Sequence, residues 1–323
     1  MRYMDIPGTG LKPSAIIIGA VCAVESDTKD AFRMLDIFRE AGGNIIDSAN
    51  VYGKWFPAGT NNCDENIGKW LKSRKCRDSF IVVSKGGHPP LDDFNKPRLN
   101  KNDVLYDLDE SLKALDTDCI DLFFLHRDDI NTPVEEIIGY LNEFIKSGKI
   151  RHIGCSNWNP ERIKDAQIYA AKHGLQGFSV NQLLWSMADI SLDKYPAPGC
   201  CKMDKTTYEY HKSSGLPAFA YSSQANGFFK KYIERDSKPV SDDLIAQYGS
   251  EDNLLKLSRA VLLSEKTGQP LSAIVLSYLT SRPFPTAAII GPRNDEQLTD
   301  SLQAADLTLT ADDISFIDID IGV

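Results

Sequence analysis

Short apolar runs alternate along the chain with longer segments in which apolar residues recur every three or four positions. Short runs are typical of buried strands, and the longer periodic segments are typical of helices that bury one face. The pattern predicts strands at 15–19, 44–47, 80–85, 120–126, 150–155, 178–182, 217–221 and 287–290. It predicts helices at 28–41, 64–71, 133–146, 160–173, 205–213, 254–266, 271–281, 295–304 and 310–319. A further helix ends at Leu115 and follows a cap at Asn100 or Asn102.

Eight strand–helix alternations in 323 residues predict the α/β class and a (β/α)8 barrel, the TIM-barrel architecture, as a single domain over 1–323. The residues around "PGTG" near the N-terminus are expected to form a β-hairpin that closes the barrel bottom. The segments 183–203 and 222–250 lack a clear period and are expected to be irregular loops that carry specificity. A doubly wound two-domain protein is the alternative. It normally needs a glycine-rich phosphate turn, and in Gly8-Thr9-Gly10 the third glycine is replaced by Pro13.

Composition narrows the class of partner. The chain has 36 basic and 45 acidic residues, a net charge of −9, which argues against binding to nucleic acid or to an anionic membrane. Seven cysteines without a Cys-x-x-Cys pair indicate reduced thiols and a cytoplasmic protein. No window approaches 18 uncharged apolar residues, so no membrane span is expected. The spacing among His88, His152, His173 and His211 is not that of metal ligands, so no metal site is expected.

Polar residues stand where three successive apolar runs end. These residues are Asp47, Lys85 and His126, and Tyr52 follows the first of them by five positions. A single charged residue at a strand end is ordinarily a solvated loop position, but the C-terminal ends of barrel strands meet at one face, where active sites lie. A tyrosine hydroxyl titrates near ~10, and a neighbouring ammonium favours its ionised form. The set is typical of a proton donor with its tuning groups.

Seven segments in order resemble those of the aldo-keto reductase family. They are "NIIDSANVYG", "FIVVSKGG", "DLFFLHRDD", "SGKIRHIGCSNW", "VNQLLWS", "AYSSQANGFF" and "IIGPRNDEQL". The resemblance implies a catalytic tetrad of Asp47, Tyr52, Lys85 and His126. Tyr52 would be the general acid that protonates a carbonyl oxygen as a cofactor delivers hydride to the carbon, with Lys85 and Asp47 lowering its pKa and His126 orienting the carbonyl.

The resemblance also implies the cofactor site. Ser156, Asn157 and Gln182 would surround the nicotinamide carboxamide, and Tyr221 would stack on the ring, although an ordinary core aromatic is the alternative. The remaining positions implied are Ser222, Ser223 and Gln224 near the diphosphate, and Gly291, Arg293 and Gln297 at the phosphate and adenosine end. Arg293 before a helix favours NADP(H), with NAD(H) second and a plain surface arginine as the alternative.

The resemblance further implies that the substrate is a small carbonyl compound or alcohol. Candidates for lining its pocket are Trp55, His88, Arg127 and Trp185, although loop aromatics often pack the loop instead. Polar loop residues (Asn61, Asn62, Gln224 and Asn226) suggest a sugar- or polyol-type carbonyl, and Lys230-Lys231 is interpreted as a solvated pair.

Two other functions stay open. One is a cofactor-sensing regulatory protein on the same barrel, and the other is an isomerase or lyase that uses Lys85 as a Schiff-base amine. The oligomeric state and the direction of reaction are also open.

Overall fold

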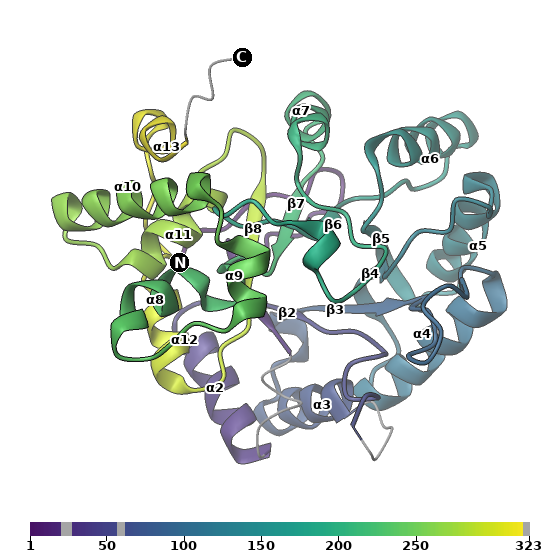
Figure 1. Ribbon diagram of the computed structural model, residues 1–323. Helices are drawn as coiled ribbons and strands as arrows, with labels where there is room; N and C mark the ends of the chain where they lie inside the picture. The colour runs from purple at the N-terminus through teal and green to yellow at the C-terminus, as the bar shows by residue number, and fades with distance from the viewer. Residues whose placement is uncertain (21–27, 57–61, 319–323) are drawn as a thin grey trace.

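Eight parallel strands form the closed barrel that the alternation predicted. The computed structural model describes residues 1–20, 28–56 and 62–318. The strands follow one another around the barrel in chain order, and β8 pairs back onto β1, with the helices arranged outside them (Figure 1). They are β1 (Ile16–Gly19), β2 (Ile45–Asp47), β3 (Ile81–Gly86), β4 (Ile120–Leu125), β5 (Ile150–Ser156), β6 (Asn181–Leu184), β7 (Ala218–Tyr221) and β8 (Thr286–Ile290).

The helices begin and end largely where capping residues predict. Asn100 caps α4 by accepting from the backbone N–H of Asp103, and Gly174 ends α6 in the left-handed conformation. The helices are α2 (Thr28–Glu40), α3 (Asn62–Arg74), α4 (Lys101–Leu115), α5 (Val134–Lys146), α6 (Pro160–His173), α7 (Lys205–Ser214), α8 (Phe228–Ile233), α9 (Asp242–Tyr248), α10 (Glu251–Thr267), α11 (Leu271–Thr280), α12 (Asp295–Leu302) and α13 (Ala311–Ile317). Within the described ranges, no helix combines the length and the apolar character that a membrane crossing requires.

Two expectations were wrong in detail. The sixth strand lies at Asn181–Leu184 rather than 178–182. The segment 222–250, expected to be irregular, contains α8 and α9. Helix α9 buries only Leu244 and Tyr248, one turn apart, so it has too few apolar positions to produce a visible period. Helix α8 follows a left-handed Gly227 without a side-chain cap, and therefore lacks a start signal.

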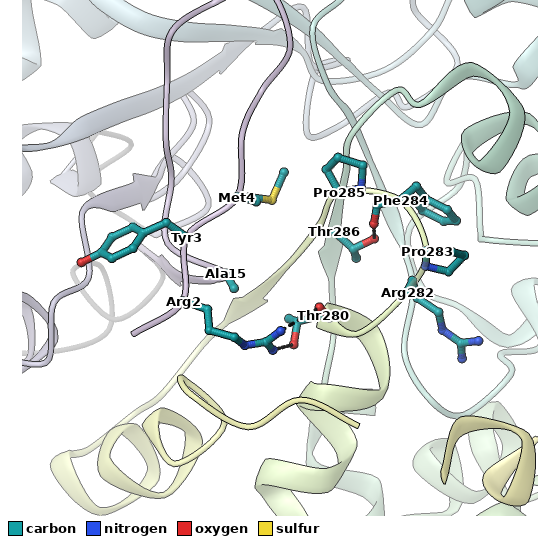
Figure 2. A pocket seen from close by; sticks show the side chains of 10 residues that line it. All are labelled: Arg2, Tyr3, Met4, Ala15, Thr280, Arg282, Pro283, Phe284, Pro285 and Thr286. Atoms are coloured by element: carbon teal, nitrogen blue, oxygen red, sulfur yellow. Dashed lines mark hydrogen bonds between the residues drawn. The ribbon is translucent and has the colours of Figure 1, made fainter. Parts of the chain in front are cut away.

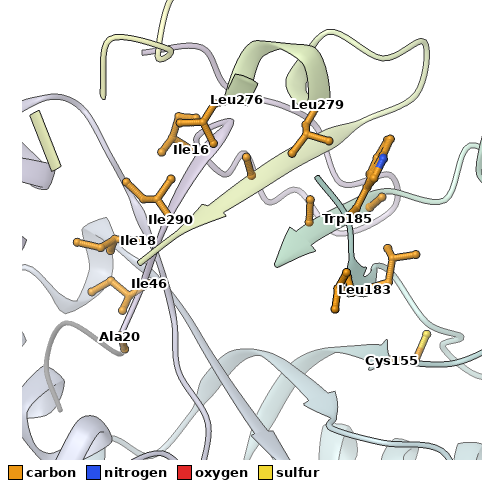
Figure 3. Close-up of a cluster of buried hydrophobic side chains, with 14 of the residues drawn as sticks. Ile16, Ile18, Ala20, Ile46, Cys155, Leu183, Trp185, Leu276, Leu279 and Ile290 are labelled. Carbon is orange, nitrogen blue, oxygen red and sulfur yellow. The ribbon is translucent and has the colours of Figure 1, made fainter. Parts of the chain in front are cut away.

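Side chains along each strand divide between two cores. Because successive side chains point to opposite faces, Ile17 lies in the cluster inside the barrel, whereas Ile16 and Ile18 lie in the outer cluster against the helices. Figure 3 shows part of the outer cluster, with Ile16 and Ile290 near Leu276 of α11. The inside cluster is apolar throughout the lower barrel, where Leu122 and Phe124 of β4 contribute to it.

An N-terminal hairpin closes the barrel bottom, as expected. The backbone N–H of Met4 donates to Pro13 O at 2.9 Å, and that of Ile6 donates to Leu11 O at 3.1 Å. Ile6 is buried among the residues inside the barrel, with Met4 and Leu11 packed beside it. The hairpin therefore excludes water from the end at which the strands begin.

A hollow of about 480 Å³ lies at this same end, between the hairpin and the loop that enters β8 (Figure 2). Arg2 lines it and donates to Thr280 Oγ1 at 2.6 Å. Ala15 and Thr286, at the starts of two adjacent strands, also line it. The hollow is therefore at the opposite end of the barrel from the polar strand ends, and it is not part of their site.

Close packing of α3 against the end of α4 gives a prediction about stability. A Cβ added at Gly68 of α3 would lie 2.5 Å from the backbone oxygen of Leu115, which cannot rotate away. We expect Gly68→Ala to lower the free energy of unfolding by about 1–3 kcal/mol. Gly139→Ala in α5 is the matched control, because its Cβ would enter open space, and it should stabilise by about 0.5–1 kcal/mol. Urea denaturation measures both, and equal stabilisation by the two variants would contradict the packing.

Candidate active site

The polar candidates continue the inward-facing stripe of apolar residues on each strand. A residue two positions after an inward-facing one faces inward as well. The inward pairs are Ile45 and Asp47, Val83 and Lys85, Phe124 and His126, Val180 and Gln182, and Phe219 and Tyr221. The barrel thus presents a polar layer directly above its apolar filling.

Lys85 and Asp47 form a buried ion pair in this layer. The Lys85 Nζ lies 2.8 Å from Asp47 Oδ2, with the two side chains 0% and 4% exposed. The ammonium also donates to Ser48 O at 2.8 Å, and Gln182 Nε2 donates to the other oxygen of Asp47 at 2.8 Å. Buried charges persist only when they are paired and hydrogen-bonded, and this pair meets both conditions.

The Lys85 ammonium stays charged in this setting. Burial alone would lower the pKa of Lys85, but the charges and hydrogen bonds of Asp47 and Tyr52 outweigh it, and the pKa is raised. The bond from Gln182 to Asp47 joins β6 to β2, strands that are not neighbours in the sheet. It therefore connects residues across the barrel mouth.

Tyr52 lies on the turn after β2 and reaches the ammonium. Its hydroxyl is 3.4 Å from Lys85 Nζ, and its ring centroid is 4.9 Å from the same atom. Burial raises the pKa of Tyr52, and the positive charge of Lys85 opposes this shift without reversing it. The sequence hypothesis had both Lys85 and Asp47 lowering this pKa. Lys85 does lower it, but burial outweighs the lysine and the charge of Asp47 raises the pKa further. The phenol consequently keeps its proton, which is the state a proton donor needs.

Two histidines beside Tyr52 are neutral. The His126 ring lies 5.8 Å from that of Tyr52 and 4.9 Å from that of His88. Burial, and next the charge of Arg127, hold the pKa of His126 well below its ordinary value. Burial lowers the pKa of His88 to about 4. Among the described residues, the buried Nδ1 of His126 has no hydrogen-bond partner, so it is available to a ligand.

The candidate nicotinamide residues lie together at the ends of β5, β6 and β7. Tyr221 Oη donates to Asn157 Oδ1 at 2.7 Å, and Asn157 Nδ2 donates to Ser156 Oγ at 3.0 Å and to His126 O at 3.2 Å. The backbone N–H of Asn157 donates to Gln182 O at 3.0 Å. Asn157 has a φ of 64°, a left-handed conformation that is concentrated at functional sites in non-glycine residues.

This group is the one that could hold a nicotinamide. Hydroxyl and amide side chains beside an aromatic ring match its carboxamide and its flat face, and Tyr221 is half-buried with one side of its hydroxyl fixed by Asn157. The group adjoins Tyr52 and His126 through the bond from Asn157 to His126 O.

The loop after β7 is joined to β8 and α12. Ser222 begins it with a φ of 51°, a further left-handed non-glycine residue. Ser223 Oγ donates to Ile289 O at 2.6 Å, and Gln224 Nε2 donates to Ser301 Oγ at 3.2 Å. The side chains of Ser223 and Gln224 therefore hold the loop in place.

The charges of two cations, Lys231 and Arg293, interact near the start of α12. Gln297 Oε1 accepts from the backbone N–H of Arg293 at 2.9 Å, and a side chain at Gly291 would meet no described atom within 4 Å. Burial and the charges of Arg293 and Lys238 lower the pKa of Lys231, whose Nζ donates to Asn226 O at 2.8 Å. Lys230 and Lys231 are both exposed, which agrees with their interpretation as a solvated pair. The charge of Arg293 nevertheless acts on Lys231, and neither residue's sequence neighbours indicate this.

The structure brings three of the four pocket candidates to the tetrad. Trp55 lies with its ring 5.7 Å from that of Tyr52 and is 45% exposed, and His88 and Arg127 adjoin His126. Trp185 is elsewhere. It is buried against Phe284, with ring centroids 6.0 Å apart, in the outer cluster (Figure 3).

Trp185 follows the inward-facing Gln182 by three positions, so alternation turns it outward.

A small hollow of about 120 Å³ on the β2–β3 side is lined by Lys85 and His88 among others. It lies next to the tetrad, and neither Tyr52 nor His126 is among its lining residues.

Comparison with known proteins places this geometry in context. The "Uncharacterized oxidoreductase YrpG" of Bacillus subtilis is 29% identical over 96% of this chain and 92% of its own length. The "Probable aryl-alcohol dehydrogenase AAD4" of Saccharomyces cerevisiae is 27% identical over 90% of this chain and 87% of its own length. A rice protein named "Probable voltage-gated potassium channel subunit beta" is 26% identical over 95% and 92%.

The fold is also that of a solved enzyme. The thermostable aldo-keto reductase Tm1743, solved with the inhibitor epalrestat, superposes with a TM-score of 0.72 and 22% identity, covering 98% of this chain and 99% of its own. The sequence model "Aldo/keto reductase family" matches residues 15–320. The chain therefore belongs to the aldo/keto reductase family, whose members are NAD(P)-dependent oxidoreductases of carbonyl and alcohol groups.

Proposed function

We propose that this protein reduces aldehydes and ketones to alcohols with NADPH, and that Tyr52 is the general acid. The observation that carries the proposal is the Lys85 ammonium, which lies 2.8 Å from the Asp47 carboxylate and 3.4 Å from the Tyr52 hydroxyl. The cofactor, when bound, supplies the hydride that no side chain can supply. Everything else in the reaction is a matter of holding the carbonyl and moving one proton.

Tyr52 gives its proton to the carbonyl oxygen. Its raised pKa keeps the phenol protonated before reaction, and the nearby ammonium stabilises the phenolate that remains afterwards. Asp47 and Gln182 fix the ammonium by fixing its partner carboxylate. A positioned general acid typically contributes about 10²–10⁴-fold to the rate.

His126 orients the carbonyl. A neutral imidazole has one N–H to donate, and the low pKa of His126 keeps it neutral across the physiological range. Donation to the same oxygen that Tyr52 protonates would stabilise the negative charge developing there.

The cationic pair near α12 favours NADP(H) over NAD(H). Arg293 and Lys231 come from separate elements, and each lies within the electrostatic influence of the other. A phosphate group between them would relieve this repulsion and accept charge-assisted hydrogen bonds. The alternative assignment of Arg293 as a plain surface residue does not account for the second cation whose charge interacts with it.

The open alternatives are less well supported. A Schiff-base mechanism needs a neutral amine, whereas the pKa of Lys85 is raised by its buried ion pair. A regulatory role is suggested by the name of the rice relative, which is that of a channel subunit, but a cofactor-sensing protein has no need for a protonated phenol beside a buried ammonium. Turnover of a carbonyl substrate with NADPH distinguishes a reductase from a cofactor-sensing protein.

Aromatic aldehydes are the favoured substrates. Several relatives are named aryl-alcohol dehydrogenases. Trp55 presents an exposed ring next to Tyr52, and the exposed ring of Phe56 adjoins Trp55. Of the polar residues behind the sugar hypothesis, Gln224 is bonded to Ser301 on the cofactor side, Asn61 lies outside the described residues, and the Asn62 side chain is not described.

Replacing the phenol tests the general acid. We expect Tyr52→Phe to lower kcat for benzaldehyde reduction by about 10²–10⁴-fold, because the ring stays but the proton donor is lost. NADPH binding, followed by quenching of its fluorescence, should be unchanged. Tyr3→Phe at the barrel bottom, whose hydroxyl bonds to Gly42 O, is the control and should keep full activity. A Tyr52→Phe enzyme within threefold of the wild type would refute the assignment.

Cofactor choice tests the cationic pair. We expect Lys231→Met combined with Arg293→Met to raise the KM for NADPH by about 10²–10⁴-fold, since two charge-assisted hydrogen bonds worth about 1.5–3 kcal/mol each are lost. The KM for NADH should change less than about threefold. Lys230→Met, which removes the adjacent exposed cation, is the control. If both cofactors lose affinity equally, the pair does not recognise the extra phosphate.

A further inference from the structure

Two consecutive side chains at the end of β4 each hold a buried nitrogen without an acceptor. These atoms are His126 Nδ1 and Arg127 Nε, and neither has a partner among the described residues. Buried polar atoms without partners are uncommon, and each calls for a physical reason. The reaction supplies one for His126, which lies against Tyr52, but it supplies none for Arg127.

The charge of Arg127 is also uncompensated by acids. Its Nη1 donates to His126 O at 2.9 Å, which is an uncharged acceptor. The two carboxylates that follow it in sequence are engaged elsewhere. Asp128 pairs with Arg162 at 2.9 Å, and Asp129 accepts from Thr132 Oγ1 at 2.6 Å. No carboxylate in the described ranges forms an ion pair with Arg127.

Arg127 is directed to the mouth of the barrel. Its Cδ would lie 3.7 Å from a Cβ at Gly199 in the loop after β6. Its charge lowers the pKa of His88 and of His126, and it also acts on Tyr221. The half-buried guanidinium is therefore close enough to His126 and to the candidate nicotinamide residue Tyr221 for its charge to act on both.

We propose that Arg127 binds a carboxylate on the substrate, so that the preferred substrates are aromatic aldehydes that also carry an acid group. This inference rests on the proposed function, because it assigns a second group of the molecule whose carbonyl Tyr52 and His126 hold. A guanidinium presents several N–H donors in a plane that matches a carboxylate. A half-buried cation without an acid gains more from such a partner than an exposed one does.

Arg127 also has a merely structural alternative, the support of the His126 backbone through His126 O. A structural role predicts equal losses with charged and neutral substrates when the side chain is removed. Recognition of a carboxylate predicts unequal losses. The comparison therefore needs substrates that differ in charge and share the reacting group.

The test uses formylbenzoate isomers and their methyl esters with NADPH. For the best isomer, we expect the wild type to show a higher kcat/KM for the acid than for its ester. Arg127→Met should reduce this acid-to-ester ratio by about 10–100-fold, chiefly through the KM for the acid, and Arg127→Lys should restore part of it. Lys54→Met is the matched control. Lys54 is another cation on the turn after β2, but it is already paired with Glu110 at 2.6 Å, so its removal should leave the ratio within about threefold.

The outcomes separate the two proposals. Turnover of acid and ester with a ratio that Arg127→Met leaves unchanged would overturn the carboxylate site and leave the proposed function standing. Absence of turnover with every substrate would overturn the proposed function. A second measurement is independent of turnover: benzenedicarboxylate binding to the NADP-loaded protein, followed by tryptophan fluorescence, should weaken at least tenfold in Arg127→Met. Preference for a formylphenyl phosphate over the formylbenzoates would overturn the assignment to a carboxylate.

Discussion

The structure depends on one buried ion pair, between Lys85 of β3 and Asp47 of β2. Neither charge could remain in the barrel alone, and removal of one partner from such a pair typically costs about 3–5 kcal/mol. The remaining hydrogen bonds of the pair go to Ser48 O and Gln182, so three strands are fixed at the same level. Because the ammonium is held on one side by the carboxylate, its remaining direction is toward the Tyr52 hydroxyl.

Burial affects the protonation of the groups around this pair in different ways, and each group has a different role as a result. It drives His88 and His126 to their neutral forms and keeps Tyr52 protonated, while Asp47 keeps Lys85 charged against the same effect. The apolar filling below and the hairpin at the bottom maintain this low-dielectric setting. One cation among neutral donors stabilises a negative oxygen more than it would in water.

Much of this could be predicted because a strand has a fixed period. The eight runs, their order and the polar residues that end them follow from local pattern, and Asp47, Lys85 and His126 were identified in this way. Trp185 was predicted to line the pocket because it follows a strand. It lies three positions after the inward-facing Gln182, however, and strand alternation would have predicted an outward side chain. The electrostatic interaction of Lys231 with Arg293 could not be predicted, since it depends on how α8 lies relative to α12.

The position of Arg127, and not its charge alone, bears on which acidic substrates the protein would prefer. The chain carries a net charge of −9, which opposes the approach of an anion, but exposed charges are screened beyond about 8 Å at physiological ionic strength. Inside the mouth the guanidinium is nearer than any such distance to a ligand held by His126, its neighbour in sequence. The separation between the reacting carbonyl and a bound acid is thus set by two adjacent backbone units at the end of β4, which are rigid because the strand is buried. Discrimination among isomers of one acid therefore follows from geometry, whereas attraction of acids as a class follows from charge.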